Sequence, residues 1–346
     1  MRRLRHLATI LGLCALTPGL SSAAMADAVA DFYRAKTLEI MVGTGPGGGY
    51  DANARLVARH MGRFIPGAPK IIVSNVPGGG GITAANKLFN VSPRDGLSIG
   101  TFSNALLTLP LISPAATRFD ATKFTWIGSL AREDGVCITS KASNVATWDQ
   151  LARKEIIAGT TAPGTTTHVY AALLANLFSG KLRLISGYPD GGSVVLAFTR
   201  GEVQALCQTY SSLNVLHPEW LAQRQVNPIV AIGLNRIPAL KDIPAIMEFT
   251  RSENERDIVR ILVAPTAAGR PFAAPPGITE DRAAALRTAF KQMSGDAEFL
   301  ADAAQARIEV QIMGGAEISS LLDDVSKTDQ AILEQVRRIV EPASAK

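Results

Sequence analysis

Three loops rich in glycine and threonine contain the residues of this sequence that are best suited to chemistry. They span residues 45–51, 77–81 and 162–168, and each follows a strand-like run and precedes a helical pattern. Such a loop exposes backbone N–H groups at the start of a helix, where the helix dipole also favours negative charge. A single loop of this kind would be an ordinary tight turn, but three equivalent loops favour the binding of an anion.

Motifs typical of enzymes are absent from the sequence. Residues 43–48 fit G-x-G-x-x-G, but the following strand ends at Ser74-Asn75, where a dinucleotide-binding fold places an acid for the ribose. The sequence has no G-K-[ST] phosphate loop and no G-x-S-x-G nucleophile turn. We therefore expect no catalytic residue and no cofactor. An exported enzyme acting on a small acid and a structural or adhesion module are the competing hypotheses.

The histidines lack the spacing of metal ligands, so no metal site is predicted. His60 falls inside a helical pattern and is interpreted as a surface or packing residue. His168 stands at a helix start among threonines. Two interpretations stay open for it, a ligand contact and a structural role.

Strand-like and helical segments alternate along the chain, which predicts an α/β architecture with largely parallel sheets. The expected strands are residues 38–42, 69–74, 97–102, 135–139, 155–158, 182–185, 203–207, 228–233 and 261–264. The expected helices are residues 51–64, 82–89, 166–178, 193–200, 279–293 and 316–340. In such sheets a ligand binds at the carboxyl ends of the strands, where the three loops lie.

Length and composition fit an ordinary globular protein of about two domains. The chain has 346 residues, of which 47% are apolar and 19% charged, with a formal net charge of +5. Three of its arginines precede an N-terminal apolar run, so the rest of the chain has little basic excess. This charge predicts neither nucleic acid nor a membrane surface as a partner.

The first 26 residues are predicted to be a secretory signal peptide. Three arginines precede the apolar run 7–20, and Ala24-Met25-Ala26 offers a cleavage site near Ala26. Cys14 follows Leu13, where a lipoprotein signal needs a small residue, so Cys14 is interpreted as part of the apolar run. We expect a protein exported to the periplasm.

Two cysteines, Cys137 and Cys207, lie beyond the predicted signal peptide. Outside the cytosol an even number permits a disulfide. Both stand in apolar strand-like runs, where buried free thiols are also common. A disulfide and two free thiols both remain open.

Two spaced glycine motifs give the chain a family resemblance. They read Pro46-Gly47-Gly48-x-x-Asp51-x-x-x-Arg55 and Val73-x-Asn75-x-Pro77-Gly78-x-Gly80-Gly81. With Gly164-Thr165-x-Thr167-His168 further on, the chain resembles the substrate-binding proteins of tripartite tricarboxylate transporters (the TctC or Bug family of periplasmic receptors).

The resemblance implies a type II periplasmic binding fold, in which two α/β domains with mainly parallel sheets flank a ligand cleft and are joined by a two-strand hinge. Domain 1 would comprise residues 27–134 and 235–346, and domain 2 residues 135–234. The chain would cross between domains near residues 133–140 and 232–238. The implied function is the capture of a small organic acid, usually a carboxylate, and its delivery to a membrane permease. We expect a monomer.

The resemblance also assigns ligand contacts by position, while Asp51 is expected to cap its helix or to receive an amino or hydroxyl group or a water. The expected ligand-binding residues are Gly47, Gly48, Gly49, Tyr50, Asp51, Gly79, Gly80, Ser103, Thr165, Thr166, Thr167, His168 and Gln208. The family usually carries Asp at the position of Gln204 and often another near Gln208, and Tyr50 and Tyr210 add an aromatic face to the expected cleft. A ring-bearing acid therefore fits as well as citrate. The alternative function is an exported binding or sensory protein for an aromatic or non-carboxylate solute, without a transporter.

Overall fold

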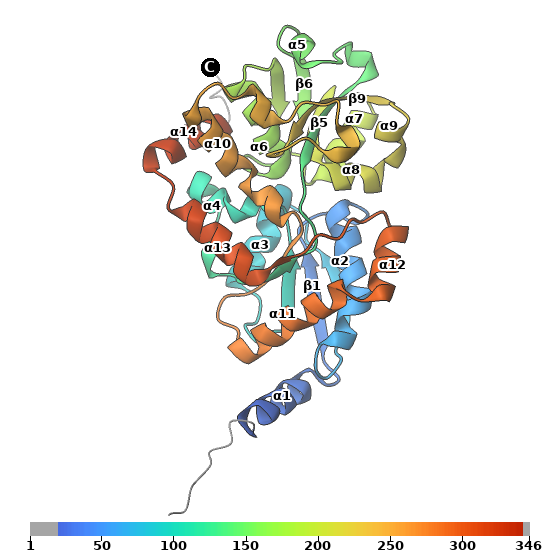
Figure 1. The fold of residues 1–346 in the computed structure, drawn as a ribbon, viewed down its shortest axis with the longest axis vertical. Coiled ribbons are helices and arrows are strands. Elements are labelled where there is room, and N and C mark those ends of the chain that lie inside the picture. The colour runs from blue at the N-terminus through green and yellow to red at the C-terminus, as the bar shows by residue number, and fades with distance from the viewer. Residues whose placement is uncertain (1–19, 342–346) are drawn as a thin grey trace, which may run out of the picture.

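The computed structural model describes residues 20–341. The predicted signal peptide therefore lies mainly outside the described residues, and no side chain before residue 27 is described. The first described element is helix α1 (Leu20–Tyr33), which leads away from the lower of two lobes (Figure 1). Among the described helices, none has the length and apolar character needed to cross a membrane.

The first sheet forms the lower lobe in Figure 1 and has the strand order β11-β4-β10-β3-β1-β2. Strands β1, β2 and β3 are parallel neighbours, whereas β10 runs antiparallel between β3 and β4. The strands are β1 (Thr37–Val42), β2 (Lys70–Asn75), β3 (Ser98–Thr101), β4 (Thr125–Ser129), β10 (Pro271–Ala274) and β11 (Met313–Gly314). Its helices are α2 (Gly49–His60), α3 (Ile82–Asn90), α4 (Leu109–Ile112), α11 (Glu280–Ser294), α12 (Ala297–Gln305) and α13 (Gly315–Ser326).

The second sheet forms the upper lobe and has the order β7-β6-β8-β5-β9. Strand β6 is parallel to β7 and β8, whereas β5 is antiparallel to β8 and β9. The strands are β5 (Gly135–Ser140), β6 (Ile156–Gly159), β7 (Leu182–Ile185), β8 (Ala205–Thr209) and β9 (Val226–Ile232). The helices of this lobe are α5 (Trp148–Leu151), α6 (Thr166–Ala172), α7 (Gly191–Thr199), α8 (Tyr210–Leu216), α9 (Pro218–Ala222), α10 (Glu253–Val263) and α14 (Gln330–Val340).

Apolar residues on both faces of each sheet explain why the sheets are covered by helices on two sides. In β5, Val136 and Ile138 pack in one core cluster and Cys137, between them, packs in another, so both faces of the strand are buried. Central strands of this kind are nearly continuous apolar runs because both faces are covered. The α/β fold class predicted from the sequence is confirmed, with antiparallel return strands in each sheet.

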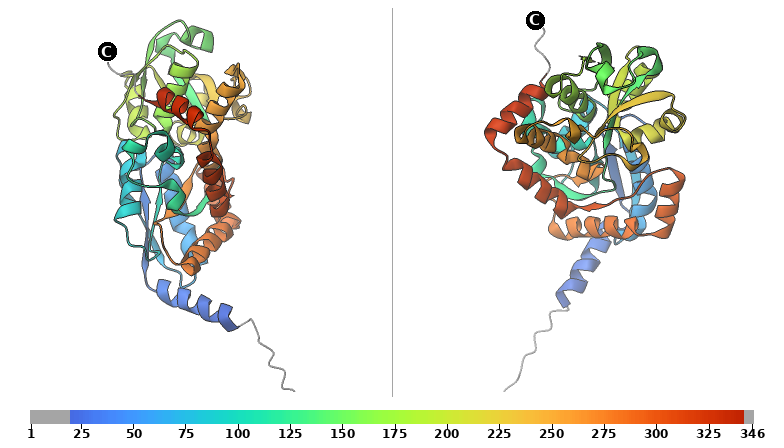
Figure 2. Two further views of the ribbon diagram at one scale, coloured as in Figure 1. Left: turned by 90° about the vertical axis from the view of Figure 1, so that its left-hand side faces the viewer. Right: turned by 45° about the horizontal axis from the view of Figure 1, so that its top comes forward.

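The chain passes from the first sheet to the second between β4 and β5, and returns between β9 and β10. Helices α10 and α14 contribute Val259, Leu262, Val336 and Ile339 to the core of the second sheet. Figure 2 shows α14 beside the upper lobe and α11 along the lower one. The C-terminal segment therefore packs on both lobes, while the predicted domain boundaries stay a prediction.

One predicted strand is wrong. Residues 261–263 end helix α10, and the strand that enters the first sheet is β10, ten residues later. A run of four apolar residues does not distinguish a strand from the buried face of a helix, and α10 buries Ile258, Leu262 and Val263 on such a face. The predicted helix 316–340 is in fact two helices, α13 and α14. Strand β4 was not predicted from the sequence at all.

Candidate ligand-binding cleft

A cavity of about 390 Å³ lies where the strand-end loops of the two sheets meet. The first sheet contributes the loops after β1, β2 and β3, and the second sheet those after β6, β7 and β8. These are the carboxyl ends of the parallel strands, where ligands bind in open α/β sheets. The lining residues are Thr44, Gly45, Pro46, Gly48, Gly49, Tyr50, Gly80, Ser103, Thr161, Thr165, Thr166, Thr167, Asp190, Gly191, Gly192, Ser193, Leu196, Gln208, Thr209, Ser212 and Leu216.

The structure brings most of the predicted site residues to this cavity. Nine of them line it, namely Gly48, Gly49, Tyr50, Gly80, Ser103, Thr165, Thr166, Thr167 and Gln208. Four others, Gly47, Asp51, Gly79 and His168, are not among the lining residues. Whether the nine contact a ligand remains a prediction.

Asp51 fixes the shape of the loop after β1. Its Oδ2 accepts hydrogen bonds from the backbone N–H of Gly47 (2.8 Å) and from Nε of Arg55 (2.9 Å), and its Oδ1 accepts one from Asn75 (2.9 Å). Asn75 also donates to the Thr44 carbonyl (2.9 Å). Burial alone would raise the pKa of Asp51, but these donors, Arg55 first, lower it below its ordinary value. The motif therefore places these three side chains where their hydrogen bonds hold the loop after β1 in its conformation.

Gly47 and Gly80 show why these loops need glycine. Gly47 has a φ of +85°, a left-handed conformation that residues with a Cβ avoid. Gly80 also has a positive φ, and a Cβ there would lie 2.6 Å from Cγ2 of Thr165 in the facing loop. The loops of the two sheets therefore approach each other through a glycine.

The threonine loop after β6 is held by its own hydroxyl groups. Oγ1 of Thr167 accepts from the backbone N–H of Thr161 (2.9 Å), and Oγ1 of Thr165 donates to the Ala162 carbonyl (2.6 Å). Thr166 differs because its hydroxyl donates to Oδ1 of Asn104 (2.9 Å), which follows β3 of the other sheet. Thr166 thus joins the two halves of the cavity.

His168 lies behind this loop and is 1% exposed. Its Nδ1 lies 3.3 Å from the backbone nitrogen of Gly164, which donates to it. Burial lowers the pKa of His168 to about 4, so the ring is neutral at pH 7 and free to accept at Nδ1. Of the two interpretations of His168, a ligand contact and a structural role, this geometry favours the structural role.

Tyr50 places its ring in the wall of the cavity and anchors its hydroxyl on the opposite side. The hydroxyl donates to the Gly269 carbonyl (3.2 Å) and accepts from the backbone N–H of Asn104 (2.8 Å). Burial raises the pKa of Tyr50 to about 12, against the lowering effect of Arg270. Tyr50 is therefore a neutral, fixed part of the wall.

Asp190 is the site residue that the sequence prediction missed most clearly. It caps α7 by accepting at Oδ1 from the backbone N–H of Ser193 (2.8 Å), and its Oδ2 accepts from the N–H of Gly45 in the other lobe (2.8 Å). Among the lining residues in the described part of the chain it is the only charged one. Residues 190–193 follow a strand and open a helix, the same pattern that singled out the other three loops.

Cys137 and Cys207 form a disulfide that joins the neighbouring strands β5 and β8. Both cysteines are buried in the core of the second sheet. The bond lies next to Gln208, which lines the cavity.

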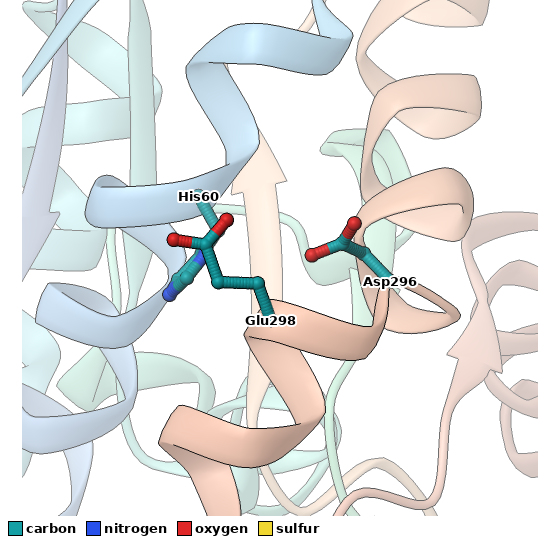
Figure 3. Close-up of side chains that lie close together, drawn as sticks. All are labelled: His60, Asp296 and Glu298. Atoms are coloured by element: carbon teal, nitrogen blue, oxygen red, sulfur yellow. The ribbon is translucent and has the colours of Figure 1, made fainter.

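Outside the cleft, His60, Asp296 and Glu298 form the group in the described residues whose side chains come close enough to hold a metal ion (Figure 3). Arg63 already forms ion pairs with Asp296 and, at 2.6 Å, with Glu298. His60 packs edge-on against Phe299. The guanidinium of Arg63 bridges the two carboxylates, and Nε2 of His60 lies 2.9 Å from Oδ2 of Asp302, so this group ties α2 and the segment after it to α12.

Several solved structures of known proteins have a similar fold. The chain resembles the solved structure of the periplasmic binding protein BugD, with a TM-score of 0.72 and 17% identity over 89% of this chain and 99% of that one. MatC from Rhodopseudomonas palustris with bound malate (TM-score 0.68, 17% identity, 88% and 99% covered) and an R. palustris protein with adipate (0.68, 17%, 88% and 97%) are also similar. No protein-family model matches the chain.

Two curated relatives are similar over part of the sequence. A UPF0065 protein of Cupriavidus necator is 32% identical over 31% of this chain, and one of Pseudomonas sp. (strain P51) is 24% identical over 63%. The chain spans 32% and 64% of these two relatives. The resemblance to the Bug and TctC family is confirmed, and the chain has the fold of these solute-binding proteins.

Proposed function

We propose that this chain is an exported receptor that captures a small organic acid in the cleft between its two lobes and delivers it to a membrane permease of the tripartite tricarboxylate type. The chain has no catalytic role in this proposal. Its similar solved structures are binding proteins, two of them with malate and adipate bound. The N-terminal sequence and these similar structures support a location in the periplasm.

The observation that carries the proposal is the way α2 begins at the cavity. Its N-cap residue, Gly48, has no side chain that could satisfy the first amides, whereas α7 is capped by Asp190. Gly48 and Gly49 line the cavity, so the free N–H groups and positive dipole end of α2 are open to a ligand oxygen. Hydroxyl groups of Ser103 and Ser212 stand in the same wall.

The rest of the lining suits the carbon skeleton of an acid. Leu196 and Leu216 lie in the wall formed by α7 and α8, and Tyr50 presents its ring. A volume of about 390 Å³ is within the usual size of small-molecule sites, and such sites combine an apolar lining with a few polar groups. A ring-bearing acid is accommodated by this composition as well as an aliphatic one.

Binding would act by closing the cleft. Gly45 donates to Asp190, Thr166 to Asn104, and the Gly80 N–H to the Pro189 carbonyl (3.3 Å), each from one lobe to the other. A ligand that contacts loops of both lobes binds the closed form more tightly than the open form. It shifts the population towards the closed form by this difference in binding free energy. The closed form is what a permease would recognise.

A thermal-shift screen against malate, adipate, benzoate and citrate tests the proposal on protein that has been unfolded and refolded to remove carried-over ligand. An acid at ~100 times its Kd adds about 2.7 kcal/mol to the free energy of unfolding, a rise of several degrees in Tm. Failure of every acid to raise Tm would overturn the carboxylate receptor and favour the alternative, a binding or sensory protein for a non-carboxylate solute.

Substitution of Thr166 by Trp tests the position of the site. The indole would fill the junction with Ser103 and Asn104, so we expect the binding of the acid to be lost. Thr199→Trp, on the exposed end of α7, is the matched control and should leave affinity unchanged. Equal affinities of the two variants by titration calorimetry would remove the threonine loop from the site.

A further inference from the structure

A buried ion pair lies directly behind the wall of the cleft. Arg270, the residue before β10, is fully buried, and its Nε lies 2.6 Å from Oε1 of Glu133, whose side chain is 2% exposed. The guanidinium of Arg270 also stacks on the ring of Tyr50, with Cζ 4.2 Å from the ring centre. Neither charged residue lines the cavity, but Tyr50 does.

The ion pair of Arg270 and Glu133 does not satisfy all of its own polar atoms. Nη1 of Arg270 and Oε2 of Glu133 are buried without a hydrogen-bond partner in the described residues. Burial raises the pKa of Glu133, while Arg270 opposes this effect. Buried polar atoms in native proteins are nearly always satisfied, so unsatisfied ones call for an explanation.

The remaining amino group of Arg270, Nη2, reaches across to the second lobe. Its two hydrogens are shared among three hydroxyl oxygens within hydrogen-bond distance, Oγ1 of Thr209 (3.2 Å), Oγ of Ser212 (2.9 Å) and Oγ of Ser211. Thr209 and Ser212 line the cleft cavity, whereas Ser211 lines a different cavity on the side of Glu133. Arg270 therefore contacts the cleft through two hydroxyl groups.

In this network of hydrogen bonds, the hydroxyl hydrogen of Ser212 is the one that is not used. The Thr209 hydroxyl donates to Oγ of Ser212 (2.8 Å), and the Ser211 hydroxyl donates to Oε1 of Glu133. Oγ of Ser212 thus accepts from both Arg270 and Thr209, which occupies its two lone pairs. No acceptor for its own hydrogen is found among the described residues, and Ser212 lines the cavity, so this hydroxyl is available to donate to a ligand.

The N-terminus of α2 lies against the same group. A Cβ on Gly49 would come within 2.6 Å of Oγ of Ser212 and 2.8 Å of Nη2 of Arg270. The first turn of α2, the Ser212 hydroxyl and the guanidinium therefore converge on one end of the cavity.

We propose that Arg270 is the cation that sets the preference of the cleft for an ionised carboxylate, and that it acts through Ser212, whose hydroxyl it orients and polarises towards the ligand. This inference rests on the proposed function and adds the polar end of the site to it. Arg270 is a positioning residue, and Ser212 is the group that touches the acid. Hydrogen bonds to charged groups are stronger than neutral ones, so an acid gains more from this donor than its amide does.

The test compares each acid with its uncharged amide by titration calorimetry, using benzoate with benzamide, adipate with adipamide and malate with malamide. Ser212→Ala should weaken binding of the acid about tenfold and change binding of the amide much less. Ser211→Ala is the matched control, because this neighbouring serine also contacts Arg270 but does not line the cleft. It should change neither affinity by more than about threefold.

A double substitution, Glu133→Gln with Arg270→Gln, removes both charges without leaving one of them buried alone. It should reduce the ratio of acid to amide affinity as Ser212→Ala does, since it removes the charge that polarises the hydroxyl. Circular dichroism and a cooperative melting curve establish that each variant is folded.

The outcomes separate the two proposals. If the wild-type protein binds none of the acids, the carboxylate receptor fails and this inference fails with it. If it binds an acid but Ser212→Ala behaves like Ser211→Ala, the receptor stands and the inference is overturned. Equal losses for acid and amide in the Ser212 and double variants would also overturn it, because they would show a packing effect and not a charge effect.

Discussion

The buried imidazole of His168 makes the stability of this protein depend on pH in a way that one substitution can isolate. The ring is 1% exposed, and Nδ1 accepts from the Gly164 N–H at 3.3 Å, so the folded protein requires the neutral form. Its pKa is lowered to about 4 by burial, against an ordinary value of about 6.5 in the unfolded chain. The unfolded chain therefore binds this proton first as pH falls.

The size of the effect follows from the difference between these two pKa values. Stability that depends on neutral His168 is complete above about pH 6.5 and is lost as pH falls towards 4, at about 1.4 kcal/mol per pH unit. The full loss is about 3 kcal/mol, a large part of the usual 5–15 kcal/mol of a folded domain. Below pH 4 the folded protein is protonated too, and the dependence on His168 ends.

Urea unfolding at pH 7.5, 6.5, 5.5 and 4.5, followed by tryptophan fluorescence, measures this dependence. The free energy of unfolding of His168→Gln, subtracted from that of the wild type, should fall steadily between pH 6.5 and 4.5, since all other titrating groups cancel in the difference. Val169→Ala, at a buried position in the same helix, should lower stability by the same amount at every pH. A constant difference between wild type and His168→Gln across this range would refute the argument.

Two other substitutions probe the cleft and the fold. Asp190→Asn keeps one acceptor oxygen, enough for the N–H of Gly45 or of Ser193, and removes a negative charge from the cavity, so an acid should bind at least about threefold more tightly by calorimetry. Weaker binding would mean that the Asp190 carboxylate serves an amino or hydroxyl group of the ligand. Replacing Cys137 and Cys207 together by alanine should lower the free energy of unfolding in urea by about 2–4 kcal/mol, since the disulfide closes a long loop. Reduction of the wild type should give the same loss, and an unchanged midpoint in both cases would contradict this expectation.

The sequence identified the loops of the cleft because their signal is local. A strand, a glycine-rich turn and a helix start follow one another within about ten residues, and the carboxyl ends of parallel strands meet at one edge of a sheet. Gly48, Gly80 and Thr166 could therefore be placed at the cavity before the fold was known. The loop at Asp190 carries the same signal and could have been found in the same way.

The polar end of the cleft could not be predicted from the sequence, because its residues meet only through the return of the chain to the first sheet. Arg270 and Glu133 are separated by more than one hundred residues, and Ser212 comes from a third segment. Residues 261–264 were predicted as the strand of this region. Tertiary contacts of this kind leave no periodic pattern in the sequence.

The distribution of charge suggests how such a cleft combines recognition with release. Asp51 is neutralised within its own loop, and His168 is kept uncharged by burial. Arg270 stands one hydroxyl away from the cavity and not in it. A guanidinium in direct contact with a carboxylate would form two parallel charged hydrogen bonds, which slow dissociation. In the proposed receptor, a neutral hydroxyl in front of the same cation would retain the preference for an anion while making only one bond to it, so an acid would be selected on entry and would still be free to leave towards the proposed permease.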